Sequence, residues 1–425
     1  MMGVKYKKAG ALFVAALLFL AGCGVIGGAE HESAEELQPI TLKVYGYKTG
    51  AEIGAIPEIV KDFEEENPDI MVEYVSLPMA SGYEELMNAK LASGEQIDIF
   101  MTQINTLEGL ENRDHLMDLS EEVWISDISS QVRNDITIHN KIYALPLEMS
   151  AVGMYCNMQL LKQYKLDLPD NWYVFVGDCA ILKDNGVVPV IMGNKNGYSG
   201  TLMLRVGEIY QAMSDENLAD DLIRQKRTYA SVLSDSLEKY DYLKENRYFN
   251  VEEANSMEQA DGALAYFANG NGAFFLGGSW DLAKIHQFNE ELELQFIPIP
   301  IVKEETDIRA TLFLGAVFCI NADTQYPEQS KRFLEYWSRP EVMERYIESQ
   351  SAFSPLMSCS NAGTQELAAF QAYVDAGKVM PFDIPGIGIY GDWEVLNEAV
   401  SLLALGESVE DVKAHIDAKM KEVLP

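Results

Sequence analysis

Basic residues are scarce in this chain, which carries 32 lysines and arginines against 66 aspartates and glutamates in 425 residues. The formal net charge at pH 7 is −34. Nucleic acid phosphates and anionic bilayer surfaces would both repel such a protein. The composition therefore argues against nucleic acid as a partner and leaves a generic acidic, soluble surface as the simplest reading of the charge.

Cysteine and histidine are also scarce, with five of each. The cysteines are Cys23, Cys156, Cys179, Cys319 and Cys359. They are far apart in the sequence, and no Cys-x-x-Cys motif or histidine-rich stretch accompanies them, so neither a zinc site nor a disulfide framework is expected. Cys156 and Cys319 lie in apolar runs, which predicts buried free thiols.

Sequence motifs of common enzymes are missing, including Gly-x-Ser-x-Gly and His-Glu-x-x-His. The glycines at 386, 388 and 391 match a dinucleotide fingerprint in spacing, but Pro381 and Pro385 precede them in place of a strand. This favours a loop, and no cofactor is expected. With 66 acidic residues, pairs of carboxylates occur by chance, so a secreted glycoside hydrolase stays open as an alternative.

The N-terminus carries a targeting signal. Lys5, Lys7 and Lys8 precede an apolar run from Ala9 to Gly22, which is shorter than the roughly 20 residues of a membrane-spanning helix. Leu20-Ala21-Gly22-Cys23 resembles the bacterial lipoprotein consensus, in which the cysteine is diacylated and becomes the first mature residue. We expect a signal peptide over 1–22; the alternatives are an ordinary secretory signal and an uncleaved anchor.

Residues 23–39 are rich in glycine and then in acidic residues, which predicts a flexible tether. Two acyl chains on Cys23 would give stable attachment, where one chain gives only reversible binding. The expected location is therefore extracytoplasmic, anchored by lipid to the outer face of the cytoplasmic membrane.

The folded part begins near Ile40 with an alternating, strand-like pattern. Apolar residues at helical spacing follow from Ile53 to Phe63, and Ile70 to Val75 again reads as a strand. A helix and a strand ending at Phe100 repeat this order, which predicts an α/β fold with a parallel sheet. Ligands of such sheets bind beyond the carboxyl ends of the strands, here the loops after Tyr45 and Phe100.

The rest of the chain is mostly helical in pattern, with a strand-like stretch at 294–302, a helix from Pro327 and two amphipathic helices after Asp392. Trp124, Trp172 and Trp337 have neighbours at strand or helix spacing, which predicts that they lie in cores.

Seven segments together resemble the extracellular solute-binding proteins of ABC importers, the family that includes the maltose- and multiple-sugar-binding proteins. They occur in the order and spacing of that family. The segments are LKVYGY at 42–47, IVKDFEEENPDIMVEY at 59–74, LASGEQIDIF at 91–100, HNKIYALPLE at 139–148, CAILKDNGVVPV at 179–190, NGAFFLGGSWDL at 271–282 and SAFSPLMS at 351–358.

The resemblance implies a two-lobed α/β fold of the periplasmic-binding-protein type, with solute held in an interlobe cleft. The three interlobe crossings would fall near 142–156, 311–321 and 352–355. The implied domains are lobe one at 40–145 plus 315–352, and lobe two at 150–309 plus 358–425. The implied role is a monomeric carbohydrate receptor that delivers a mono- or oligosaccharide to the transmembrane permease subunits by closing its lobes.

A sugar presents apolar C–H faces and a rim of hydroxyl groups, so its site needs aromatic platforms and hydrogen-bonding side chains. Trp280 follows two glycines in GGSWD, where the resemblance implies a stacking ring, with a core position as the alternative. Asp281 is either a hydroxyl acceptor or a helix cap. Glu148, at the first crossing, could accept charge-assisted hydrogen bonds from hydroxyl groups; the alternative is a solvated or salt-bridged glutamate. Trp393 resembles a late aromatic residue of the family, although it also begins an amphipathic helix.

Tyr47, just past the first strand, and Gln103 and Asn105, just past the strand ending at Phe100, complete the candidate ligand-binding set. For each of these three, an ordinary surface position is the alternative. No catalytic or metal-binding residue is expected. A surface lectin or sensor of the same fold is a further alternative. The solute could also be a uronate, a phosphorylated polyol or a peptide.

Overall fold

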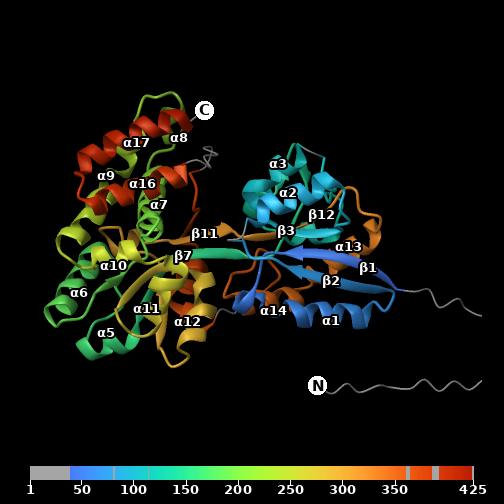
Figure 1. Cartoon of the computed structure of the whole chain (residues 1–425), viewed down its shortest axis with the longest axis horizontal. Coiled ribbons are helices and arrows are strands. Elements are labelled where there is room, and N and C mark those ends of the chain that lie inside the picture. Colours follow the sequence, from blue (N-terminus) through green and yellow to red (C-terminus); the bar gives the residue numbers. More distant parts are fainter. Residues whose placement is uncertain (1–38, 80–81, 113, 360–363, 385–391, 424–425) are drawn as a thin grey trace, which may run out of the picture. The chain divides into compact units, whose positions relative to one another are not determined.

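The computed structural model describes residues 39–79, 82–112, 114–359, 364–384 and 392–423 (Figure 1). The predicted signal peptide, Cys23, nearly all of the tether and the glycines at 386, 388 and 391 lie outside the described residues. Within them, two mixed sheets are each covered by helices, which makes the fold a two-lobed α/β fold.

The first sheet has the strand order β2-β1-β3-β12-β6. β1 pairs in parallel with β2 and β3, whereas β12 is antiparallel to β3 and β6. The strands are β1 (Ile40–Gly46), β2 (Ile70–Ser76), β3 (Ile99–Gln103), β12 (Ala316–Ile320) and β6 (Leu145–Pro146).

The predicted strand, helix, strand unit is confirmed as β1, α1 (Ile56–Glu66) and β2. α1 buries Ile56, Ile59 and Phe63 on one stripe, which is the helical period read from the sequence. The prediction that β3 ends at Phe100 is wrong. The strand continues to Gln103 because β12 pairs with it as far as Ala316 opposite Gln103.

The second sheet has the order β13-β11-β7-β9-β8, with β10 paired to β7. β7 lies at its centre, is antiparallel to β9, β10 and β11, and is buried along its whole length. The strands are β13 (Val379–Met380), β11 (Ala310–Leu314), β7 (Met149–Asn157), β9 (Phe274–Gly278), β8 (Val190–Ile191) and β10 (Leu294–Ile297). A separate hairpin consists of β4 (Thr137–Ile138) and β5 (Lys141–Ile142).

Figure 1 shows α1, α2, α3, α13 and α14 around the first sheet and most other helices around the second. The helices near the first sheet, besides α1, are α2 (Tyr83–Ser93), α3 (Leu107–Glu111), α4 (Ser130–Asp135), α13 (Pro327–Trp337) and α14 (Pro340–Gln350). Those of the second are α5 (Met158–Tyr164), α6 (Trp172–Asp184), α7 (Tyr198–Met213), α8 (Leu218–Ile223), α9 (Tyr229–Glu245), α10 (Val251–Ser256), α11 (Leu264–Ala268), α12 (Leu282–Phe288), α15 (Ala368–Asp375), α16 (Asp392–Leu405) and α17 (Val409–Val423).

Short helical turns join several of these elements. They are η1 (Gly50–Ile53), η3 (Ile104–Thr106), η4 (Val123–Asp127), η5 (Gln259–Ala263), η6 (Ser279–Asp281), η7 (Glu305–Asp307) and η8 (Gln365–Leu367).

Three segments of chain connect the two sheets, as expected. β6 leads into β7, and β11 leads into β12 through Gly315. The Gly315 N–H donates to the Glu148 carbonyl at 2.9 Å, and Met149 and Phe353 exchange two backbone hydrogen bonds of 2.8 and 2.9 Å. These bonds tie the three crossings to one another, so a hydrogen-bonded seam runs across the connections between the lobes.

The cores confirm several predictions. Trp124, Trp172 and Trp337 are all buried. Cys156 and Cys319 are free and buried, and burial raises the pKa of both thiols. These two thiols therefore act as small apolar groups.

Candidate functional site

Glu148 lies where the chain passes from β6 to β7, and its side chain is buried. Its Oε1 atom accepts a hydrogen bond from Lys48 Nζ at 2.7 Å, and its Oε2 atom accepts one from the Tyr346 hydroxyl at 3.0 Å. Burial, together with the charge on Glu148, holds the pKa of Tyr346 well above its ordinary value. Both carboxylate oxygens are thus already bonded, so Glu148 fixes the buried Lys48 ammonium at the end of β1.

Tyr47, Gln103 and Asn105 lie at the carboxyl ends of neighbouring strands of the first sheet. β1 and β3 are parallel, so Tyr47 and Gln103 lie at the same edge of that sheet. Gln103 and Asn105 are exposed, whereas Tyr47 is buried beside Lys48. The structure therefore brings Tyr47, Gln103, Asn105 and Glu148 to one edge.

Trp280 lies in η6, directly after β9, and is half-buried. A methyl group on Gly278 would overlap the Trp280 ring, so the glycine lets the indole fold back over its own backbone. The Tyr155 hydroxyl donates to the Gly278 carbonyl at 2.8 Å, which anchors the turn to β7. Gly278 therefore positions the tryptophan.

Asp281 caps this turn. Its Oδ2 atom accepts hydrogen bonds from the Gly278 N–H and from Gln259 Nε2, both at 2.9 Å. Burial raises the pKa of Asp281 to about 6, against the lowering effect of these two hydrogen bonds. The Asp281 carboxylate therefore bonds to the turn itself, as the helix-cap alternative for this residue predicts.

Five half-buried aromatic side chains form a continuous row on the lobe of the second sheet. Trp280 contacts Phe313 with ring centroids 5.9 Å apart, and Phe313 contacts Phe382 at 5.2 Å. Phe382 contacts Trp393 at 6.1 Å, and Trp393 contacts Tyr198 at 5.6 Å. We call these five residues the aromatic row. Each ring packs against the core below it and keeps part of its surface accessible.

The row brings together parts of the chain that are distant in sequence. Trp280 and Trp393 were predicted, whereas Tyr198, Phe313 and Phe382 were not. Tyr198 follows an Asn-Gly turn at the start of α7, Phe313 lies in the crossing strand β11, and Phe382 follows β13. Only the position of Phe313 beside a predicted crossing gave a usable signal in the sequence.

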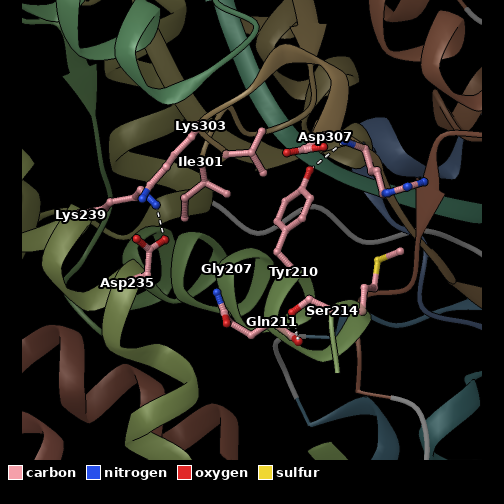
Figure 2. Close-up of a pocket in the computed structure, with 12 residues that line it drawn as sticks. Gly207, Tyr210, Gln211, Ser214, Asp235, Lys239, Ile301, Lys303 and Asp307 are labelled. Carbon is pink, nitrogen blue, oxygen red and sulfur yellow. Dashed lines mark hydrogen bonds and ion pairs between the residues drawn. The ribbon is translucent and has the colours of Figure 1, made fainter. Parts of the chain in front are cut away.

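A separate cavity of about 550 Å³ lies beside the second half of α7 (Figure 2). Tyr210 points into it, and its hydroxyl accepts a hydrogen bond from the Arg309 N–H at 2.7 Å. Lys239 and Asp235 form an ion pair on its wall. No residue of the aromatic row lines this cavity, so it is distinct from the row.

Within the ranges that the structure describes, no group of three or more histidine, cysteine, aspartate or glutamate side chains is placed to hold a metal ion. A search of the same residues finds no helix that combines the length and apolar character needed to cross a membrane.

Related proteins share most of the length of this chain. The multiple sugar-binding protein of Streptococcus mutans is 23% identical over 353 residues, covering 81% of both chains. The melibiose/raffinose/stachyose-binding protein MelE of Bacillus subtilis is 21% identical over 353 residues, covering 80% of this chain and 79% of MelE.

Solved structures agree in fold. The solute-binding protein RafE in complex with raffinose superposes with a TM-score of 0.74 at 19% identity, covering 89% of this chain and 98% of RafE. A sugar transporter of Bacillus licheniformis in complex with stachyose gives a TM-score of 0.67 at 19% identity, covering 89% and 99%. Residues 49–344 match the family of bacterial extracellular solute-binding proteins, and the chain belongs to this family.

Proposed function

We propose that this protein is the extracellular carbohydrate receptor of an ABC importer, with the aromatic row as the platform for its sugar. The row is the observation that carries the proposal. Its five half-buried rings offer an extended apolar surface, and C–H faces of pyranose rings pack on such surfaces. A row of this kind suits an oligosaccharide better than a single small sugar, because successive pyranose rings of the oligosaccharide can stack along it.

The edge of the first sheet supplies the polar half of the proposed site. The side chains there are Tyr47, Lys48, Gln103, Asn105 and Glu148, of which Gln103 and Asn105 are exposed. Amides can donate to one hydroxyl group and accept from another, as sugar recognition requires. Lys48, held by Glu148, retains donors on its ammonium group.

Binding then proceeds by closure of the two lobes about the hydrogen-bonded crossings. We assign residues 40–145 and 315–352 to lobe one, and residues 150–309 and 358–425 to lobe two. A sugar that touches both lobes only when they close shifts the equilibrium toward the closed state. The permease would recognise that state.

The contacts of Glu148 and Asp281 argue against these two carboxylates as the catalytic pair of a glycoside hydrolase. Retaining and inverting hydrolases need two carboxyl groups free to act on the scissile bond. Glu148 is bonded to Lys48 and Tyr346, and Asp281 to its own turn. The related proteins are binding proteins in their names, which favours a receptor. A surface lectin or sensor would share this site but would have no permease partner.

We further propose that Cys23 carries the lipid anchor and that residues 23–39 are the tether. A monomeric receptor without an anchor would diffuse away from a cell that lacks an outer membrane. Attachment keeps it beside the permease on the outer face of the cytoplasmic membrane.

A thermal-shift screen of the mature protein tests this function. The panel contains melibiose, raffinose, stachyose, maltose and their constituent monosaccharides, with glucuronate as an anionic probe. A sugar that binds only the native state raises the melting temperature, and we expect this for at least one neutral oligosaccharide. Each mixture is also examined for hydrolysis products. Turnover would support the hydrolase instead, and no shift with any panel member would contradict the receptor.

A further inference from the structure

Beneath one end of the aromatic row lies a buried ionic cluster from three helices. We call Arg205 and Glu208 of α7, Tyr229 of α9 and Asp392 of α16 the arginine cluster. Arg205 Nη1 lies 2.6 Å from Asp392 Oδ2 and 3.0 Å from Glu208 Oε2. The Tyr229 hydroxyl bonds to Glu208 and lies 3.0 Å from Asp392 Oδ2. All four side chains are at least 95% buried.

The cluster is linked to two of the five rings of the row, to one through the backbone and to the other through a side-chain contact. Asp392 immediately precedes Trp393 at the start of α16, so the bonds that hold Asp392 also fix the backbone that carries this ring. On the other side, the guanidinium carbon of Arg205 lies 5.9 Å from the centroid of the Phe382 ring. This distance is within the range of cation–π attraction. Arg205 is therefore the one cluster residue that reaches both Phe382 and, through Asp392, Trp393.

Arginine suits this position because of its shape. The planar guanidinium can donate to carboxylates within its plane while presenting its face to an aromatic ring, which a lysine ammonium cannot do. Among the described residues, no acceptor lies within hydrogen-bond distance of the buried Arg205 Nε atom. An unpaired buried donor costs stability. The position of Arg205 is therefore set by its contacts with the carboxylates and the Phe382 ring, and its Nε–H is left without a hydrogen bond within the described part of the chain.

The charges of the cluster do not balance. Arg205 is its only cation, and it faces Glu208 on its own helix, Asp392 on α16 and Asp383 next to Phe382; Tyr229 faces it from α9. Burial raises the pKa of Glu208 to about 7, against the charge of Arg205. Desolvation also raises the pKa of Asp383, again opposed by Arg205. The Glu208 carboxyl is therefore partly protonated near neutral pH.

We propose that Arg205 is a positioning residue for the solute site: through Asp392 and the Phe382 ring it holds Phe382 and Trp393 in line with the rest of the aromatic row. The proposal rests on the proposed function, because the row is the sugar platform only in that account. Because Arg205 is buried beneath the row, it acts through these neighbours. Proton uptake by Glu208 weakens its attraction to Arg205, and we expect this to move the two rings.

The test uses Arg205→Lys in the mature chain, which keeps the charge but loses the planar face. Arg227→Lys is the matched control, because Arg227 pairs with Asp215 on the same lobe and contacts no ring of the row. The first readout is acrylamide quenching of Trp393 in the free protein, taken as the difference between each protein and its Trp393→Phe counterpart. The second readout is raffinose affinity by calorimetry.

We expect Arg205→Lys to increase Trp393 quenching and to weaken raffinose binding at least fivefold, with the control unchanged in both. Trp393 quenching at the wild-type level overturns the positioning role, whatever the affinity. If wild-type protein does not bind raffinose, raffinose is not its solute, and the quenching result still decides the role of Arg205. If Arg205→Lys does not fold, Tyr229→Phe replaces it, since it removes the hydroxyl bonds to Glu208 and Asp392 and keeps the ring.

A pH profile separates positioning from general stability. The Trp393 signal of the wild-type protein should change with a midpoint near pH 7, and Glu208→Gln should remove this step. A flat wild-type profile, or a step that persists in Glu208→Gln, contradicts the coupling between the cluster and the ring.

Discussion

Trp280 and Trp393 differ in their environment from the other three tryptophans of the chain. Trp124, Trp172 and Trp337 are buried, whereas Trp280 and Trp393 are half-buried and contact further half-buried rings. Partial exposure leaves an indole face available to a ligand, and aromatic groups of this size dominate binding energies.

Replacing Trp280 with alanine should weaken sugar binding at least tenfold while leaving the fold intact. The ring lies at the end of the row and supports few other side chains, so its loss removes stacking and little of the core. Calorimetry measures the affinity and far-UV circular dichroism the fold. Tyr173→Ala is the control, since Tyr173 is 61% exposed on α6 and outside the row. An unchanged affinity in Trp280→Ala would remove this residue from the site.

Asp178 should make the stability of the protein depend on pH. Its side chain is buried in α6, its Oδ2 atom has no hydrogen-bond partner among the residues that the structure describes, and burial raises its pKa to about 6. A carboxyl group whose pKa is raised by folding stabilises the native state at low pH. That contribution is lost as the pH rises from about 4 to about 6.

The Asp178→Asn variant tests the direction of this pH dependence. Above pH 7 the change removes a buried charge and should raise the melting temperature by on the order of 2 °C, whereas near pH 4 it should have little effect. Melting curves at pH 4, 6 and 8 measure the difference. A melting temperature that the substitution lowers at pH 8 would show that the Asp178 charge has a partner.

Single residues also mark the limits of sequence reasoning. The turn before Trp280 and the crossing that contains Glu148 could be predicted from the sequence, because each depends on a short local pattern. The pairing of Glu148 with Lys48 was not, since it joins residues 100 positions apart. Tyr198 and Phe382 were missed for the same reason: their partners in the row are brought close only by folding.

At the scale of elements, the turn from β9 through η6 couples the second sheet to the row. Gly278→Ala should displace the Trp280 ring, because the added methyl group would overlap it. We expect sugar affinity to fall by about the same factor as in Trp280→Ala, measured by calorimetry.

Gly177→Ala is the matched control, because a methyl group there would enter open space on α6. Alanine has the higher helix propensity, so this control should keep its affinity and melt at the same or a slightly higher temperature. Equal affinities of Gly278→Ala and the wild-type protein would mean that the turn does not set the ring position.

Elements with strong periodicity were predicted well. β1, α1, β2 and α13 lie within a few residues of their predicted positions, because each buries one regular face. The end of β3 was wrong because its last residues are ordered by β12, which is more than 200 residues later in the chain. Pairing between distant strands leaves little trace in local sequence.

At the scale of the whole molecule, the account requires that the two lobes close on a sugar. Small-angle X-ray scattering of the mature protein should show a smaller radius of gyration with a saturating sugar than without it. The double variant Trp280→Ala/Trp393→Ala should show no such decrease at the same sugar concentration. An unchanged radius in the wild-type protein at saturation would contradict closure.

The anchor can be tested separately from binding. Cys23→Ala should release the protein from membranes into the medium, because no acyl chains can be attached. Cys359→Ala, which changes a free buried thiol, should leave the protein with the membrane fraction. Membrane retention of Cys23→Ala as a chain already cut after Gly22 would contradict the proposed lipidation, whereas retention of the uncut precursor would reflect its apolar run from Ala9 to Gly22.

The two-lobed fold and the family were predictable because they rest on many segments in a fixed order. The identity of the solute was not, since in the proposed site it depends on how five rings and one polar edge are arranged in space. The arginine cluster belongs to the same class of features, as its four residues span almost 190 positions of the chain.

The most direct test of the central claim is calorimetric titration of the mature protein and of Trp280→Ala/Trp393→Ala with the oligosaccharide that gives the largest thermal shift. The account predicts one binding site in the wild-type protein, with a dissociation constant of about 1 μM, or roughly −8 kcal/mol, and binding at least a hundredfold weaker in the folded double variant. Equal affinities in the two proteins would contradict it.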